Sequence, residues 1–153
     1  MSGAVDPIDA DACCAGPTAC VFAKAVLSRH VGCELARRQA FGERELVSCS
    51  SPVAHTNCGT LAALLRERAT FALKLPPASM PLLHVKALQL QCGGVLALQQ
   101  ALQAEAADVH RLVQQAQVRW GSLMDAPWAQ IVPVVAAWQA RRRHRPGADP
   151  PAR

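Results

Sequence analysis

Residues 60–74 read TLAALLRERATFALK, and this stretch decides the fold class. Its leucines and alanines recur every three to four residues, while the charged side chains of Arg66, Glu67 and Arg68 fall outside the apolar stripe. That spacing gathers the apolar side chains on one face of an α-helix. Pro76 and Pro77 follow, and proline cannot continue a helix. We therefore expect a helix that ends at Lys74.

Helical spacing of apolar residues continues on both sides of this stretch. Nothing alternates at period two for long, and tyrosine is absent, so the sequence gives no convincing strand. Gly42 weakens the second helix, Pro133 bends the last one, and Gly93-Gly94 marks a kink or a close backbone approach. We predict an all-α fold, a single-domain bundle of four to six helices. The expected helices cover residues 20–29, 34–47 (from Cys33 or Glu34), 60–74, 82–120 and 127–143.

Composition and length place the chain among single globular domains. It has 153 residues, of which 51% are hydrophobic and 18% charged, enough to bury a core without crosslinks. Glycine, proline and aspartate are concentrated at the ends. We expect a flexible leader at 1–17, a helical domain at 18–145 and a flexible tail at 146–153.

The sequence shows no targeting or membrane segment. Its acidic start lacks the basic and apolar regions of a secretory signal. The apolar run at 128–138 is much shorter than the roughly 20 residues that span a bilayer. We expect a cytoplasmic protein with no membrane contact. Stable disulfides are rare in that compartment, so metal binding or burial must account for most of the seven cysteines.

The net charge of +5 is unevenly distributed, with a basic stretch RRRHR at 141–145. No aromatic residues are interleaved with these arginines, and no nucleic-acid-binding motif accompanies them. We therefore predict no specific binding of nucleic acid.

Enzymatic motifs are missing from the sequence. It has no glycine-rich phosphate loop and no HExxH, and its acidic residues mostly stand next to arginines, as on a solvated surface. His84 and His110 stand singly within helical stretches. We assign no catalytic residue, and the sequence favours a protein that is not an enzyme.

The cysteines carry the one chemical signal. From the third onward they are spaced C-x12-C-x15-C-x8-C, without the CxxC pairs of zinc ribbons and common ferredoxins. Cys20 follows the potential cap Thr18, Cys33 follows Gly32, and Cys58 follows the potential cap Asn57. We therefore expect three thiols at helix N-termini, where the helix dipole and free N–H groups lower the thiol pKa and favour an anionic cluster.

Cys49 completes the set within the stretch VSCSSPVAHTNCGTL, residues 47–61. We interpret this stretch as a ligand loop, in which Asn57 caps a helix whose first turn presents Cys58. A helix that began at Ser51 instead would place Cys58 about 10 Å along its axis, too far from Cys49 for a shared metal. The interpretation therefore predicts a late helix start.

These residues favour a [4Fe–4S] cluster on Cys20, Cys33, Cys49 and Cys58, for electron transfer, redox sensing or a structural purpose with a protein or redox partner. A zinc ion bound by the four cysteines, or by three of them and His55, is an alternative. A second alternative is a metal-free adaptor, whose cysteines are core residues and whose glutamine-rich helix and basic end bind a partner. We expect Cys92 to be a core residue and Cys13 and Cys14 to lie outside the ligand set.

Overall fold

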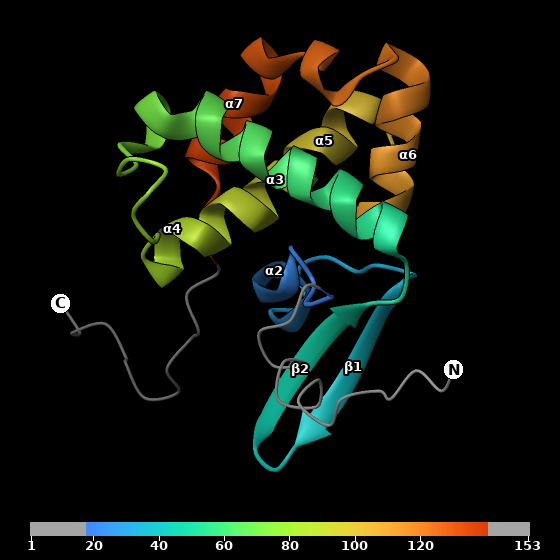
Figure 1. The fold of residues 1–153 in the computed structure, drawn as a ribbon. Coiled ribbons are helices and arrows are strands. Elements are labelled where there is room, and N and C mark those ends of the chain that lie inside the picture. Colours follow the sequence, from blue (N-terminus) through green and yellow to red (C-terminus); the bar gives the residue numbers. More distant parts are fainter. Residues whose placement is uncertain (1–17, 141–153) are drawn as a thin grey trace, which may run out of the picture.

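The protein consists of a helical body and a two-stranded hairpin, as described by a computed structural model for residues 18–140 (Figure 1). The predicted leader and tail, and residues 141–143 at the end of the last predicted helix, lie outside the described residues. Within residues 18–140, no helix is both long enough and apolar enough to cross a membrane.

The longest element is α3 (Pro52–Leu73), which confirms the helix expected at 60–74 but begins earlier. The Ser51 side chain caps its start by accepting a hydrogen bond of 3.2 Å from the Ala54 N–H, and Pro52 occupies the first helical position. Lys74 ends the helix in the left-handed conformation, with φ 53°. The predicted start near Asn57 is therefore wrong, because the serine–proline pair forms an earlier cap.

Three further helices form most of the body with α3. In Figure 1, α5 (Gly94–Leu102), α6 (Val109–Trp120) and α7 (Trp128–Ala137) gather on one side of α3. Helix α5 packs against α6 and α7, and α3 packs against the same two helices. A short 3-10 turn, Leu123–Asp125, links α6 to α7. The largest fully buried side chains of the core are Phe22, which precedes α2, and Leu61, Leu98, Leu112 and Ile131 of these helices.

The long helix predicted over 82–120 is broken into pieces. It starts with α4 (His84–Leu88), continues through a π-helical turn (Gln89–Gly93) and α5, and stops at Gln103, which has φ 52°. Helix α6 then starts anew at Asp108, whose carboxylate accepts a hydrogen bond from the Arg111 N–H. The helical spacing of apolar residues continues across the break between α5 and α6, because both helices bury residues in the same core.

The expected close approach at Gly93-Gly94 is confirmed. A Cβ atom on Gly93 would lie 3.1 Å from the Cα of Val135, and one on Gly94 would lie 2.5 Å from Cδ1 of Leu65. These glycines therefore let α7 and α3 pack closely against the π-helical turn.

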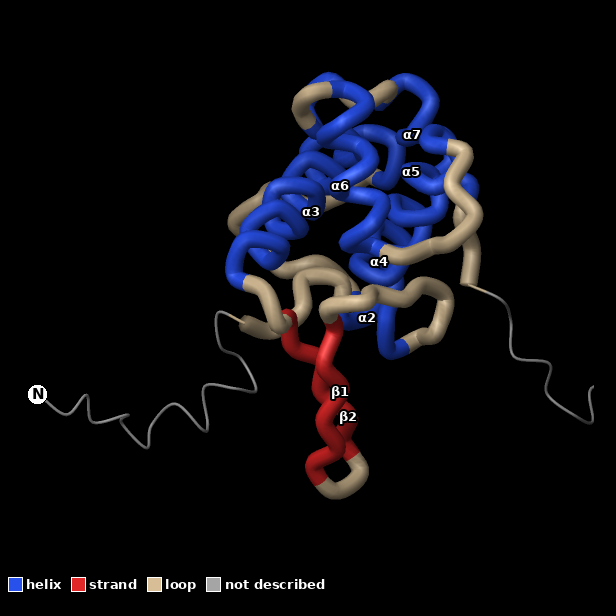
Figure 2. The backbone as a smooth tube through the Cα atoms, turned by 90° about the vertical axis from the view of Figure 1, so that its right-hand side faces the viewer, coloured by secondary structure: helices blue, strands red, loops and turns tan. Residues whose placement is uncertain are grey.

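The prediction of an all-α fold is wrong, because residues 36–49 form an antiparallel hairpin. Strand β1 (Ala36–Phe41) pairs with β2 (Arg44–Cys49), and the hairpin extends away from the helices (Figure 2). Gly42 has φ 59° and occupies the first position of the two-residue turn, a conformation that favours glycine. The glycine that we expected to weaken a helix is therefore part of the hairpin turn.

The hairpin is attached to the rest of the chain at its base. The Cys49 N–H donates to the Thr18 carbonyl at 2.7 Å, and the Cys20 N–H donates to the Val47 carbonyl at 2.9 Å. Helix α2 (Ala23–Leu27) follows, so the helix expected at 20–29 is shorter than predicted. The segment just before α2 thus holds the base of the hairpin against the body.

A second attachment lies beside the start of α6. The Gly32 N–H donates to the Ala107 carbonyl, and the Val109 N–H donates to the Gly32 carbonyl, both at 2.9 Å. These two bonds bring the chain just before β1 to the N-terminus of α6.

Candidate metal centre

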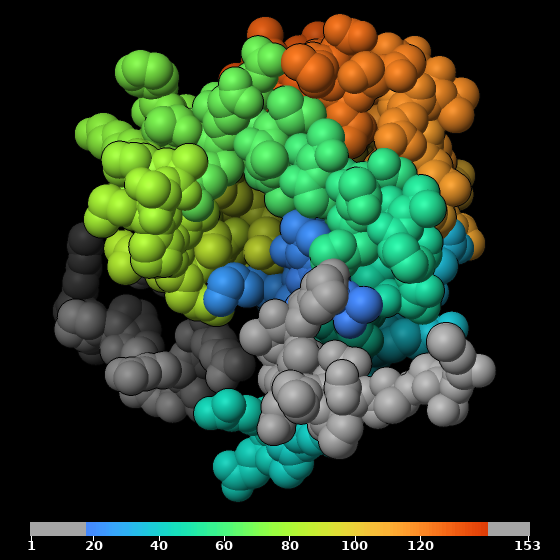
Figure 3. All heavy atoms as spheres, viewed as in Figure 1, coloured from blue at the N-terminus to red at the C-terminus, as the bar shows by residue number. Residues whose placement is uncertain are grey.

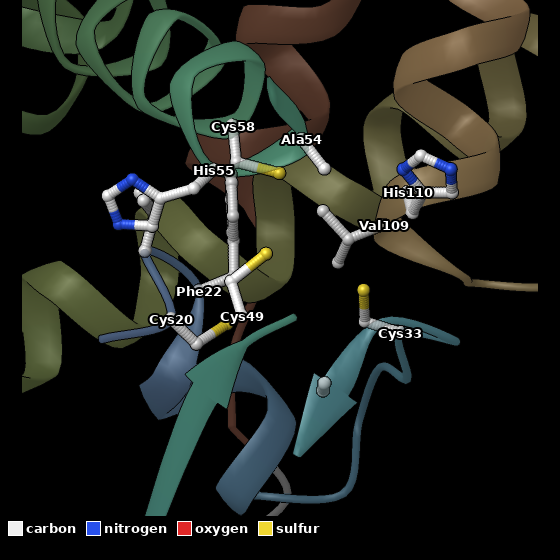
Figure 4. Close-up of a pocket in the computed structure, with 11 residues that line it drawn as sticks. Cys20, Phe22, Cys33, Cys49, Ala54, His55, Cys58, Val109 and His110 are labelled. Carbon is white, nitrogen blue, oxygen red and sulfur yellow. The ribbon is translucent and has the colours of Figure 1, made fainter. Parts of the chain in front are cut away.

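All four cysteines predicted as ligands line one cavity at the junction of the hairpin and the body (Figure 4). Cys20 comes from the segment before α2, Cys33 from the segment before β1, Cys49 from the end of β2, and Cys58 from α3. Their sulfur atoms face a common space in Figure 4. The cavity is small, with a volume of about 10 Å³.

Cys58 lies in the second turn of α3 rather than at its start. It stands four residues after Ala54, so the two side chains share a helix face, and both line the cavity. Strand β2 approaches that face from outside the helix and ends at Cys49. The early helix start therefore does not separate Cys49 from Cys58, because the strand and the helix meet at the cavity.

Cys33 is not at a helix start, which corrects the expectation of three helix N-termini. It precedes β1, in the segment that is hydrogen-bonded to the start of α6. Hydrogen bonds from the backbone N–H groups of Leu35 and His110 each lower the pKa of its thiol. A helix N-terminus does face Cys33, but it belongs to α6, which follows some 75 residues later in the chain.

The thiols are less acidic than the sequence suggested. Burial is the largest cause, and it raises the pKa of Cys20, Cys33 and Cys58 above the ordinary value. For Cys58, burial and the charges of Cys33, Cys20 and Cys49 together raise the pKa to about 12. The backbone N–H of Phe22 opposes this effect at Cys20. These thiols are therefore protonated at neutral pH, and a bound cation would have to displace their protons.

Cys49 makes a different local contact. Its thiol donates to the Ser51 carbonyl at 3.2 Å, close to the cap of α3. This contact fixes the side chain at the point where the chain turns from β2 into the helix.

His55 lines the edge of the cavity, but its ring is turned away from the sulfur atoms in Figure 4. Its Nε2 lies 3.0 Å from the Ala19 carbonyl oxygen, which accepts a hydrogen bond, so this nitrogen carries the proton. Only Nδ1 is then left as a metal ligand. The contact fits a role in holding residues 18–20 in place.

Sequence reasoning missed the apolar wall of the cavity. Beside the thiols lie Val21, Phe22, Ala36, Ala54 and Val109, and the backbone of His110 is close to Cys33. Nothing in the spacing of the cysteines points to the start of α6. A short polar cap at Asp108 marks that helix start, but it does not indicate what the helix faces.

Cys92 lies outside this cavity. Cys92 is 1% exposed, lies in the π-helical turn and has its sulfur 3.6 Å from the Ser28 hydroxyl, so it is a core residue as expected. Cys13 and Cys14 lie outside the described residues. Within residues 18–140, no group of three or more His, Cys, Asp or Glu side chains has the arrangement that holds a metal ion.

Comparison of the chain with protein-family models, curated proteins and solved structures gives no match. The cavity and its lining residues are then the basis for a functional proposal.

Proposed function

We propose that this chain is a small cytoplasmic iron–sulfur protein, with a [4Fe–4S] cluster bound by Cys20, Cys33, Cys49 and Cys58. The observation that carries the proposal is the meeting of four thiols, from four separate segments, at one cavity. Buried free cysteines that act only as core residues have no reason to gather in this way, and Cys92 does not join them.

A cubane and a single zinc ion place their ligand sulfurs at different distances from one another. Zinc draws its thiolates to about 2.3 Å from one point. A cubane takes one thiolate on each iron, so its ligand sulfurs lie about 6–7 Å apart. The apolar residues beside the thiols agree better with a large, apolar-shelled cubane than with a single zinc ion.

The surroundings of the thiols also suit a cluster. Val21, Phe22, Ala36, Ala54 and Val109 give the cavity an apolar wall, which limits the access of water. Backbone N–H groups near Cys20 and Cys33 are positioned to donate to sulfur, and such donors stabilise an anionic cluster. When bound, the cluster would supply one-electron redox chemistry. The four cysteines would hold it and exchange their protons for iron.

The location of the site favours a sensing or structural purpose. The four ligands would join residues 18–20, both ends of the hairpin, and α3. Oxidation or loss of the cluster would then release the base of the hairpin from the helical body. A protein or redox partner that contacts the hairpin would read that change.

Anaerobic reconstitution of the full chain with iron and sulfide tests the proposal. We expect a brown protein with a broad absorption band near ~400 nm and about four iron and four sulfide per chain. Replacing Cys20, Cys33, Cys49 or Cys58 singly by serine should lower the iron content severalfold. Cys92→Ala and the double variant Cys13→Ala/Cys14→Ala serve as matched controls and should keep the cluster.

Two results would overturn the proposal of an iron–sulfur cluster. A colourless protein that retains one zinc per chain would establish the zinc alternative. A protein that binds neither iron nor zinc, and whose four variants behave like Cys92→Ala, would instead support the metal-free adaptor.

A further inference from the structure

A second cavity lies between α3, α4 and the start of α2, and Phe22 lines both this cavity and the one that holds the cysteines. Figure 3 shows a hollow on this face, where α3 (green) and α4 (yellow-green) meet. Its volume is about 270 Å³, near the lower end of the sizes of small-molecule sites. The wall is apolar except for Arg66 and Gln91. The apolar lining residues are Phe22, Ala62, Ala63, Leu65, Leu82, Ala87 and Leu90.

Arg66 is held at the edge of this cavity with an unused donor. Its Nη2 donates to the carbonyls of Pro77 at 2.9 Å and Met80 at 2.6 Å, which fixes the guanidinium against the loop before α4. Its Nε is buried and has no hydrogen-bond partner. No carboxylate within residues 18–140 forms a salt bridge with Arg66, so both its charge and this donor are uncompensated there.

Gln91 adds to the excess of donors. Its carbonyl Oε1 accepts a hydrogen bond of 3.1 Å from the Ala25 N–H, and its amide N–H groups remain. The segments 18–33 and 75–104, which form two walls of the cavity, contain no aspartate or glutamate. The polar groups of the cavity are thus donors beside one positive charge, and their natural complement is an anionic acceptor.

We propose that this cavity binds a medium-chain carboxylate, with its alkyl chain against the apolar wall and its carboxylate on Arg66. Because the two N–H groups of Nη2 already donate to carbonyls, the carboxylate would accept one charge-assisted hydrogen bond from the unused Nε–H. Binding in this cavity does not require the cluster.

Titration calorimetry of the full chain with octanoate tests this site, with octanol as the neutral probe of the same chain length. We expect one saturable site for octanoate and at least tenfold weaker binding of octanol. Arg66→Gln should weaken octanoate binding about ten- to a hundredfold, the effect of losing a charge-assisted pair. Arg68→Gln on the same helix is the matched control, because Arg68 lies over the Trp128 ring instead and its loss should leave octanoate binding unchanged.

A second variant is needed because Arg66→Gln also removes the hydrogen bonds to the loop before α4. Gln91→Glu keeps an oxygen for the Ala25 N–H but puts a carboxylate in place of the amide donor, so it should also weaken octanoate binding at least tenfold. The proposal is overturned if octanoate shows no saturable binding. It is equally overturned if octanol binds as well as octanoate, or if Arg66→Gln and Gln91→Glu bind octanoate as tightly as the unaltered chain, since the hollow is then only an apolar surface.

Discussion

Residues 18–51 and residues 52–137 are stabilised by different means. Of the buried apolar residues in the described chain, five lie in the first region and 22 in the second. The second region thus supplies most of the apolar core, and the five buried residues of the first region pack into the same core. The first region has a five-residue helix and a two-stranded hairpin, and such a hairpin is marginal by itself. Three of the four proposed ligands belong to this weaker region, where a bound cluster would contribute folding energy directly.

Removal of the cluster should give the largest effect, a faster amide exchange that is confined to the first region. We expect amides of residues 36–49 to exchange with solvent on the order of a hundredfold faster in the cluster-free chain, because their opening is then opposed mainly by a few hydrogen bonds. Amides of α5 and α6 should keep their protection. Hydrogen exchange followed by mass spectrometry, on the reconstituted and the cluster-free chain, measures both regions at once. Equal acceleration in both regions would show that they form one cooperative unit.

A substitution that creates a void in the core of the second region should destabilise the whole chain. Leu98 is 2% exposed in α5, and Leu98→Ala removes buried methyl groups and leaves a void. We expect the free energy of unfolding to fall by about 2–5 kcal/mol. Val118 on α6 is 88% exposed, so Val118→Ala should change it by less than about 0.5 kcal/mol. Urea unfolding of both variants tests this difference, and a cost below about 1 kcal/mol for Leu98→Ala would contradict the assignment of the core to this region.

Two glycines should respond in opposite directions to the same substitution. A Cβ on Gly93 would lie 3.0 Å from Cβ of Trp138 and 3.1 Å from Cα of Val135, so Gly93→Ala should cost about 1–3 kcal/mol. Gly59 lies within α3 and has nothing within 4 Å of such an atom, so Gly59→Ala should stabilise the chain by about 0.4–1 kcal/mol. Thermal unfolding of the two variants measures both effects. Stabilisation by both substitutions would show that packing around Gly93 has room, and destabilisation by both would contradict the expectation for Gly59.

The same two regions differ in how far sequence predicts them. In the second region, apolar residues at helical spacing from 60 to 118 bury one face of each helix, so the period itself predicts α3, α5 and α6. The period does not predict the break at Gln103, because that break depends on one residue in a left-handed conformation. The close approach at Gly93 was predictable, since adjacent glycines inside an apolar helix leave room for a neighbouring backbone.

In the first region the spacing of apolar residues says little about secondary structure. Strand β1 has no buried residue, and β2 buries only Val47, so neither strand shows an alternation of apolar and polar residues that marks it. Arg38 is fixed by Glu45 and by the Val26 carbonyl, both at 3.0 Å, which are contacts that sequence does not reveal. The spacing of caps and cysteines nevertheless predicts four residues that line one cavity. The expected helix starts are wrong for all three thiols concerned, because Cys20 precedes the Phe22 cap of α2, Cys33 precedes β1 and Cys58 lies in the second turn of α3.

The smallest expected effect concerns pH and the thiols of the metal-free chain. The pKa of Cys58 is raised to about 12 by burial and by the neighbouring thiols, whereas the unfolded chain has the ordinary value. The folded state therefore binds this proton more tightly, and its stabilising effect is complete below pH ~9 and is lost as pH rises towards 12. We expect at most about 1 kcal/mol of lost stability by pH 10, because Cys58 is only partly buried.

Urea unfolding at pH 8 and pH 10 measures this loss. Cys58→Ala removes the group and should lose less stability over the same interval, and the chain has no tyrosine whose ionisation would obscure the comparison. A loss as large in Cys58→Ala as in the unaltered chain would show that Cys58 keeps an ordinary pKa. The thiol would then be open to solvent, and the cavity at the junction of the two regions would be looser than its lining residues indicate.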